Sequence, residues 1–271
     1  MSGASDRHWL VLRLEAPLVS FGAVAIDSNG VIWDFPALSM LTGVFANALG
    51  YERTEREAHQ ALQDRLVVAS RRDDEPYDGV LTDVQNVQMQ KSDKGWTTRG
   101  APEGRDGGSY DGPHRRFRDY HPDALVTVVV TLRPPSSTET CGSRLPPSLD
   151  DLAHALDRPD RPLFIGRKPC LPAAALNTRL VVTAATAHAA LLKLPPPVDR
   201  SRTPRRAARP SRAVELRAQW PAGEGPREGP LVDRLIALPD RRNWISGLHG
   251  GTRSVVEGRV RPDKPSREAS I

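Results

Sequence analysis

The feature that most constrains the fold is a nine-residue run at 124–132 that contains four valines, two threonines and no charged side chain. β-Branched residues favour strands, and a strand this apolar belongs in the interior of a sheet instead of at its edge. The run therefore predicts a central strand. A chain with such a strand must supply neighbouring strands and covering helices around a shared hydrophobic core.

Length and composition limit the classes of protein that remain. The 271 residues suffice for one large domain or two small ones. With 38% hydrophobic and 5% aromatic residues, 25 Pro and 21 Gly, the composition excludes a coiled coil and a collagen repeat. No apolar stretch approaches the roughly 18 residues of a spanning helix, and the amino-terminal residues lack the order of a signal peptide. Cys141 and Cys170 can form one disulfide at most, so we expect a cytoplasmic protein without membrane contact.

Periodicity and turn residues predict the remaining elements. Pro36 begins and Gly50 ends a segment with helical spacing of apolar residues, and Ser148 caps a short amphipathic helix that extends to residue 156. A further helix is expected at 55–64. The predicted strands are 8–14, 66–70, 79–90, 163–166, 179–183, 214–218 and 254–260. Their order predicts an α+β fold with a ferredoxin-like (RRM-like) sheet and one helical face.

Composition also divides the chain into three parts. Residues 1–195 hold the ferredoxin-like domain, interrupted by a long insertion at 88–117. Residues 196–213 are a Pro/Arg-rich linker or solvated tip, with a phosphate contact as the alternative, because six arginines fall within thirteen residues from 200 to 212. Residues 214–271 form a C-terminal β extension that packs on the main domain, with Trp220 and Trp244 as the expected packing anchors.

Arginine supplies most of the positive charge. The chain has 38 Lys and Arg against 33 Asp and Glu, a net charge of +5, and only five of the cations are lysines. Arginine binds phosphate through a planar, bidentate fork, so a nucleic-acid partner is an open possibility. Six cations and six glycines lie between residues 91 and 116, a stretch too long for an ordinary loop. Its guanidinium groups can neutralise phosphates and its aromatic rings can stack on bases; a mobile loop without function is the alternative.

Two other glycines indicate places where a ligand or another part of the chain could approach the backbone closely. Gly166 precedes Arg167 and Lys168 at a predicted strand end, where a phosphate could reach the backbone; an ordinary solvated loop tip is the alternative. Gly43 lies inside the first predicted helix, where glycine costs about 1 kcal/mol relative to alanine. Either a ligand or close packing of the helix on the sheet explains it.

Catalytic and metal-binding motifs are largely missing. The cysteines have no partner at zinc-ligand spacing, and neither a phosphate loop nor a serine nucleophile elbow occurs, so we expect no metal and no cofactor. The acidic run from Asp73 to Glu75 is interpreted as a solvated turn. His114 and His121 flank Tyr120, and this group could cleave RNA without a metal through proton transfer.

Six segments, in chain order, resemble the CasD family of the RAMP superfamily, whose members cap the 5′ end of the guide RNA in type I-E CRISPR Cascade complexes. The first two are the opening strand and turn at 12–22 and the first helix at 35–50. The next two are Thr-Asp-Val-Gln-Asn-Val-Gln at 82–88 and Arg-Asp-Tyr-His-Pro-Asp-Ala at 118–124. The last two are Leu-Phe-Ile-Gly-Arg-Lys-Pro-Cys at 163–170 and the closing strand at 253–260.

The resemblance implies a RAMP domain whose thumb, 88–117, reaches the neighbouring backbone subunit, while the sheet, the first helix and the Gly166 loop hold the RNA handle. Two positions depart from the family pattern. Ala37 and Leu38 replace Thr-Arg, so phosphate contact there would rest on Ser39 and backbone amides. Gln85 replaces a histidine, which favours a subunit that does not cut RNA.

The resemblance thus implies a non-catalytic, guide-RNA-binding subunit whose partners are the repeating backbone subunit and the large subunit, with target DNA contacted only indirectly. The alternatives are a metal-independent guide-RNA endoribonuclease of the type I-C kind and a protein-interaction module with acidic partners. The predicted RNA-binding residues are Ser39, Gln85, Asn86, Gln88, Lys91, Arg99, Arg105, Arg115, Arg116, Arg118, Tyr120, Gly166, Arg167 and Lys168.

Overall fold

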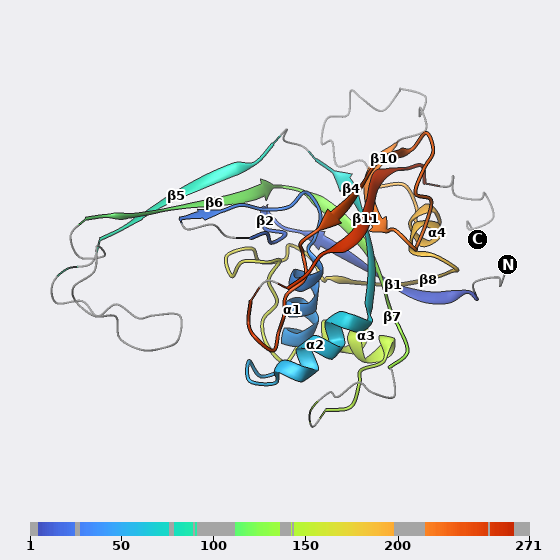
Figure 1. Ribbon diagram of the computed structural model, residues 1–271, viewed down its shortest axis with the longest axis horizontal. Coiled ribbons are helices and arrows are strands. Elements are labelled where there is room, and N and C mark those ends of the chain that lie inside the picture. The colour runs from blue at the N-terminus through green and yellow to red at the C-terminus, as the bar shows by residue number, and fades with distance from the viewer. Residues whose placement is uncertain are drawn as a thin grey trace.

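The computed structural model describes residues 5–24, 28–75, 79–88, 90, 112–135, 142, 144–197, 215–248 and 250–262. The fold is mixed α/β, with one large sheet, a smaller sheet that carries a projecting hairpin, and helices packed around the large sheet (Figure 1). No helix in these ranges is long and apolar enough to cross a membrane.

The large sheet has seven strands in the order β10-β11-β9-β4-β7-β1-β8. These strands are β1 (Arg7–Glu15), β4 (Leu66–Asp74), β7 (Leu125–Leu132), β8 (Asn177–Ala184), β9 (Leu216–Pro221), β10 (Val232–Leu238) and β11 (Arg253–Val260). The smaller sheet consists of β2 (Leu18–Val19), β3 (Asn29–Gly30), β5 (Leu81–Val87) and β6 (His114–Pro122). The helices are α1 (Leu38–Ala48), α2 (Arg56–Arg65), α3 (Leu149–Asp157) and α4 (Ala187–Leu192).

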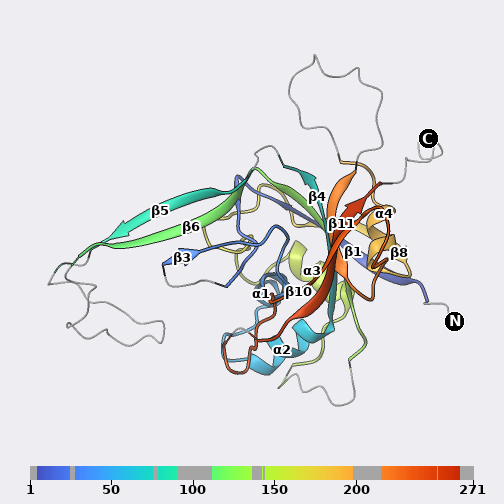
Figure 2. The ribbon, with the colours of Figure 1, turned by 45° about the horizontal axis from the view of Figure 1, so that its top comes forward.

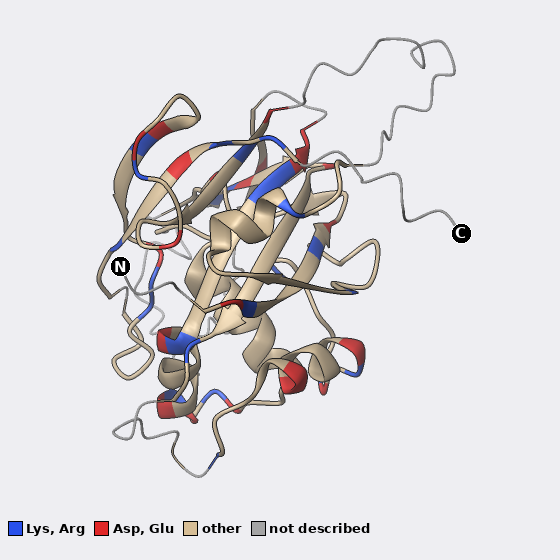
Figure 3. Cartoon of the chain, turned by 90° about the vertical axis from the view of Figure 1, so that its right-hand side faces the viewer, with Lys and Arg blue, Asp and Glu red and all other residues tan. Residues whose placement is uncertain are grey.

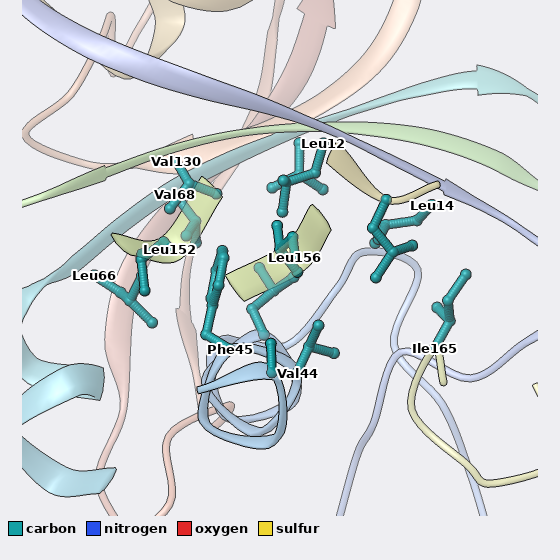
Figure 4. Close-up of a cluster of buried hydrophobic side chains, with 14 of the residues drawn as sticks. Leu12, Leu14, Val44, Phe45, Leu66, Val68, Val130, Leu152, Leu156 and Ile165 are labelled. Carbon is teal, nitrogen blue, oxygen red and sulfur yellow. The ribbon is translucent and has the colours of Figure 1, made fainter. Parts of the chain in front are cut away.

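The predicted central strand is confirmed. β7 pairs antiparallel with β1 on one side and with β4 on the other, and seven of its eight residues are buried. Its side chains alternate between two cores, because Val128 and Val130 face the cluster under α1, α2 and α3, whereas Val129 faces the opposite cluster. Val44 and Phe45 of α1 lie between the helix and the sheet in the first of these clusters (Figure 4).

The helices cover both faces of the sheet, so the expectation of a single helical face is wrong. Ala187, Ala190 and Leu191 of α4 pack in the second cluster with Trp9 and Val11. This six-residue helix has only three buried positions, too few to produce a clear helical period in the sequence. The three helices that were predicted are confirmed as α1, α2 and α3, and Ser148 caps α3 by accepting a hydrogen bond from the backbone amide of Asp151.

The segment 163–166 is not a strand. Ile165 accepts a hydrogen bond from the Ser20 amide at 3.2 Å, and its own amide donates to the Cys170 carbonyl at 2.8 Å. The Ile165 side chain is fully buried. The apolar residues therefore belong to a buried turn that is closed by the hydrogen bond between Ile165 and Cys170. A short apolar run in the sequence is the same for such a turn as for a strand, so the prediction of a strand failed here.

The acidic run at 73–75 is also not a solvated turn. β4 continues to Asp74, and the Asp73 carboxylate accepts a hydrogen bond from Arg71 Nε at 2.5 Å and another from Thr127 Oγ1 at the same distance. The side chains of Arg71 and Asp73 are 2% and 5% exposed. The ion pair places two opposite charges in contact inside the protein, which offsets the cost of burying them.

The C-terminal strands extend the large sheet at the β4 edge. β9 pairs with β4, β11 pairs with β9, and β10, which the sequence analysis did not predict, forms the outer edge. Trp220 is 1% exposed, as expected of an anchor. Trp244 is half-buried and stacks on His59 of α2 with a centroid distance of 4.8 Å.

Candidate nucleic-acid interface

The hairpin of β5 and β6 carries most of the described RNA-binding candidates, and it projects from the body of the protein in both ribbon views (Figures 1 and 2). Gln85 lies opposite Arg116 in the register, and Asn86 lies opposite Arg115. Successive residues of a strand point to opposite faces, so the two pairs occupy different faces of the hairpin. The candidates come together as two groups, not as one patch.

The hairpin arginines differ in what they contact. Arg115 is exposed and Arg116 is half-buried, and neither has an ion-pair partner in the described part of the chain. Arg118 Nη1 donates to the carbonyls of Phe117 at 3.2 Å and Ser28 at 3.4 Å. Gln88 is exposed. Three predicted residues, Lys91, Arg99 and Arg105, lie outside the described residues.

Arg167 anchors the end of the hairpin nearest the body of the protein, at Asp119 and Tyr120 of β6, which we call the foot. Its Nη1 donates to the Asp119 carbonyl at 2.7 Å, its Nη2 donates to the Gly30 carbonyl at 2.6 Å, and its guanidinium lies 4.9 Å from the centre of the Tyr120 ring. Tyr120 is only 3% exposed. Arg167 therefore joins the loop after 163 to β3 and β6, while the neighbouring Lys168 is exposed.

Gly166 is required by the protein's own backbone. Its φ is +88°, and a Cβ atom at this position would lie 1.7 Å from the Ser20 carbonyl oxygen. A side chain there would both strain the backbone and collide with the turn that follows β2. This contact with Ser20 accounts for the glycine without a phosphate.

The amino terminus of α1 is already occupied. The Leu38 amide donates to Asp240 Oδ2 at 2.9 Å and the Ser39 amide donates to the Asp240 carbonyl at 3.0 Å. Arg253 holds the same carboxylate through Nε and Nη2. Helix amino termini attract negative groups, and here a carboxylate of the C-terminal extension fills that place. The expectation that backbone amides at Ser39 are open to phosphate is therefore wrong, and only its side chain can contribute.

A pocket of about 470 Å³ brings Ser39 and Gly166 together. Gly43 also lines it, and a Cβ atom at this position would meet no other atom within 4 Å, so this glycine faces open space and not the sheet. Since Gly166 lines the pocket and Arg167 contacts β6, the pocket opens beside the foot of the hairpin. Its lining also includes Asn47, Tyr51, Glu52, Arg53, His59, Arg161 and Phe164.

The positive charge of this pocket comes from two arginines that the sequence analysis missed. Arg53 is exposed and has no ion-pair partner within the described ranges, whereas Arg161 pairs with Glu52 at 2.6 Å. Burial lowers the pKa of His59, so its imidazole is neutral at physiological pH. The half-buried Phe164 adds aromatic surface, whereas the Tyr51 ring is only 6% exposed and lies 4.7 Å from the Arg144 guanidinium that covers it. In the sequence, the only indication of Arg53 was its place in Tyr-Glu-Arg, directly after the Gly50 that ends the first predicted helix.

Two of the three residues of the catalytic alternative, His121 and Tyr120, are buried, whereas His114 is half-buried at the opposite end of β6. His121 is 4% exposed, its Nε2 lies 3.0 Å from the Trp33 carbonyl, and burial lowers its pKa. Tyr120 lies beneath Arg167. No group of three or more His, Cys, Asp or Glu residues that could hold a metal ion occurs in the portion described.

Comparison with known proteins identifies the class. A family model described as CRISPR-associated protein (Cas_Cas5) matches residues 9–256, almost the whole chain. The chain therefore belongs to the Cas5 family of CRISPR-associated proteins, as the CasD resemblance implied. The Cascade subunit CasD of Escherichia coli (strain K12) is 26% identical over 164 residues, which cover 60% of this chain and 67% of CasD.

Two solved structures share the fold. A chain of a CRISPR RNA-guided surveillance complex superposes with a TM-score of 0.61 at 22% identity, covering 96% of this chain and 95% of the other. A second structure, described as a Cas protein, gives a TM-score of 0.52 at 23% identity and covers 95% of this chain and all of the other.

Proposed function

We propose that this protein is a non-catalytic subunit of a Cascade-type surveillance complex that binds the guide RNA and caps its 5′ handle. The observation that carries the proposal is the pocket beside the hairpin foot, in a chain of the Cas5 family. Arg53 and Ser39 offer phosphate contacts, the half-buried Phe164 offers aromatic surface for a base, and Gly43 leaves space for it.

The fold supports a RAMP-type assignment. The strands β4, β7, β1 and β8 are neighbours in that order, and each adjacent pair is antiparallel. Helices α1 and α2 connect β1 to β4 in the sequence, and α3 connects β7 to β8. This β-α-β-β-α-β succession, with the first and third strands at the centre, is the arrangement of a ferredoxin-like domain. We propose that β9, β10 and β11 are an extension of that domain.

The hairpin is proposed as the thumb that meets the neighbouring backbone subunit. Six of the seven residues of β5 are exposed, including Val84 at 52% and Val87 at 57%. Exposed apolar residues on a projecting hairpin favour contact with a protein, while Arg115 and Arg116 favour contact with RNA beside it. Contact with the large subunit, and with target DNA only indirectly, completes the proposed set of partners.

Absence of cleavage is part of the proposal. His121 and Tyr120 are buried and contact the protein's own groups, which supports RNA binding over proton transfer to a scissile phosphate. Incubation of the purified protein with repeat RNA in EDTA tests this directly. We expect intact RNA, and specific cleavage would establish the endoribonuclease alternative.

The pocket itself is tested by filling it. Gly43→Trp places an indole in the open space, while Gly43→Ala adds one methyl group and raises helix stability by about 1 kcal/mol. We expect Gly43→Trp to weaken binding of a 5′-handle RNA oligonucleotide at least about tenfold and Gly43→Ala to bind as the wild type does. Equal binding by both variants would remove the pocket from the site. Binding should also fall steeply with salt, since phosphate contacts release counterions.

A further inference from the structure

A second cleft opens within the large sheet, where β4 and β9 separate. The two strands pair only through Ser70 with Gln219 and Arg71 with Ala218. Beyond these pairs the strands diverge, and a cleft of about 310 Å³ lies between residues 66–68 and residues 221–223. It shares no lining residue with the pocket beside the hairpin.

Four guanidinium groups line this cleft against one carboxylate. The arginines are Arg133, Arg227, Arg241 and Arg253, and the carboxylate is Asp64. Four positive charges minus one negative charge leave +3, and counting the buried Asp240 that binds Arg253 leaves +2. A concave surface with an excess of one charge concentrates the field within it. Elsewhere on the ribbon, segments of Lys or Arg and of Asp or Glu adjoin at several places (Figure 3).

The four arginines form two groups, two that bind carboxylates of the protein and two that do not. Arg241 pairs with Asp64, and Arg253 pairs with Asp240, so both serve the protein's own carboxylates. Arg133 and Arg227 are exposed and form no ion pair with any described residue. Arg227 Nε donates to the Ala222 carbonyl at 2.7 Å, which fixes the guanidinium at the rim and leaves its two terminal nitrogens for another acceptor.

We propose that this cleft binds the sugar–phosphate backbone of a nucleic-acid strand through Arg133 and Arg227, a second contact that rests on the proposed RNA-binding function. Guanidinium forks match the geometry of phosphate oxygens. No aromatic side chain lines the cleft among the described residues, so it offers no surface on which a base would stack. The chemistry therefore fits phosphates and not bases, and binding is independent of sequence.

The position of the cleft connects it to the first pocket. Leu38, the first residue of α1, lines the cleft, and Ser39, the next residue, lines the pocket. The start of α1, held by Asp240 and Arg253, thus borders both. The phosphates can come from the guide RNA beyond its handle or from a DNA duplex, which present the same chemistry; a duplex in the cleft would be a direct DNA contact in place of the indirect one proposed above.

Replacement of both rim arginines tests the proposal. The variant Arg133→Ala/Arg227→Ala is compared with Arg234→Ala, which removes another exposed arginine, one that pairs with Glu257 on β11 away from the cleft. Binding is measured by fluorescence anisotropy at several KCl concentrations. The three probes are a handle oligonucleotide, a full-length guide RNA and a duplex DNA of unrelated sequence. Urea unfolding of each variant reports on the fold.

We expect the double variant to lose at least about tenfold in affinity at low salt for the full-length guide RNA or the duplex. The slope of log K against log salt should fall by about 1.4 for single-stranded RNA or about 1.8 for duplex DNA, the value for two phosphates. Handle binding and the unfolding free energy should not change. Loss for the guide RNA alone identifies RNA as the source, and loss for the duplex identifies DNA.

Wild-type affinity and slope in the double variant for all probes would overturn the cleft proposal while leaving the handle proposal intact. An equal loss in Arg234→Ala would also overturn it, because general surface charge would then explain the effect. If the wild-type protein binds neither RNA, the proposed function fails. The cleft proposal then fails too, unless the double variant loses affinity for the duplex DNA.

Discussion

The foot of the β5–β6 hairpin and its outer part use the same residue type for different purposes. At the foot, Arg167 donates from both terminal nitrogens to the carbonyls of Asp119 and Gly30. Farther out, Arg115 is exposed and forms no ion pair with the described residues. A guanidinium group in an Arg-rich chain therefore fastens the fold where carbonyls surround it and can bind an external phosphate only where they do not.

The largest expected effect is at the foot, in Gly166→Ala. The new methyl group would collide with the Ser20 carbonyl, and the backbone would keep a left-handed conformation that alanine disfavours. We expect a loss of about 3–5 kcal/mol in the free energy of unfolding, measured with urea. Gly43→Ala, in open space, is the matched control and should be at least as stable as the wild type. Equal stability of both variants would contradict the account of the foot.

Arg167→Ala should cost about 2–3 kcal/mol of unfolding free energy, because two charge-assisted hydrogen bonds and the contact with Tyr120 are lost. Lys168→Ala changes the adjacent exposed cation and should stay within about 0.5 kcal/mol of the wild type. If Arg167→Ala were as stable as Lys168→Ala, Arg167 would not fasten the hairpin.

Acid should loosen the foot before the outer part. Burial lowers the pKa of His121 in the folded protein, so the unfolded chain binds the proton more tightly. The stabilising effect of the neutral ring is fully present above the unfolded pKa of about 6.5 and is lost as pH falls below it. The protection factors of the β2 and β6 amides, which correct for the slower intrinsic exchange at low pH, should therefore fall relative to those of the outer half of β5 as the pH drops from about one unit above this pKa to about one unit below it. An equal change in protection factors along the whole hairpin would contradict this role.

The smallest effect on stability is expected for Arg115→Ala, within about 0.5 kcal/mol, together with weaker RNA binding. Loss of one phosphate contact should reduce the salt slope by about 0.7. A change in stability similar to that of Arg167→Ala, without a change in binding, would remove the distinction between the two regions.

The sequence predicted what local patterns determine. The valine-rich strand at 124–132, the helix ended by Gly50 and the Ser148 cap each depend on residues a few positions apart. The contacts that define the site depend on residues far apart in the chain. Asp240 fills the amino terminus of α1 from 202 positions away, and no pattern near Leu38 indicates it.

The pocket shows the same limit. Ser39 and Gly166 were identified separately, but Arg53, Arg161 and Phe164 join them only through the packing of α1 against the loop that follows α3. The role of Arg167 was likewise hidden, because a cation beside a glycine looks the same in sequence whether it meets a phosphate or a carbonyl. Such distinctions require the three-dimensional arrangement of backbone acceptors.

The most direct test of the central claim is to sequence the RNA that copurifies with the protein. If the protein holds the guide RNA by its 5′ handle without cutting it, the bound RNAs should share one repeat-derived 5′ end and continue into varied spacers. RNAs without a common 5′ end, or a preparation free of RNA, would contradict the account.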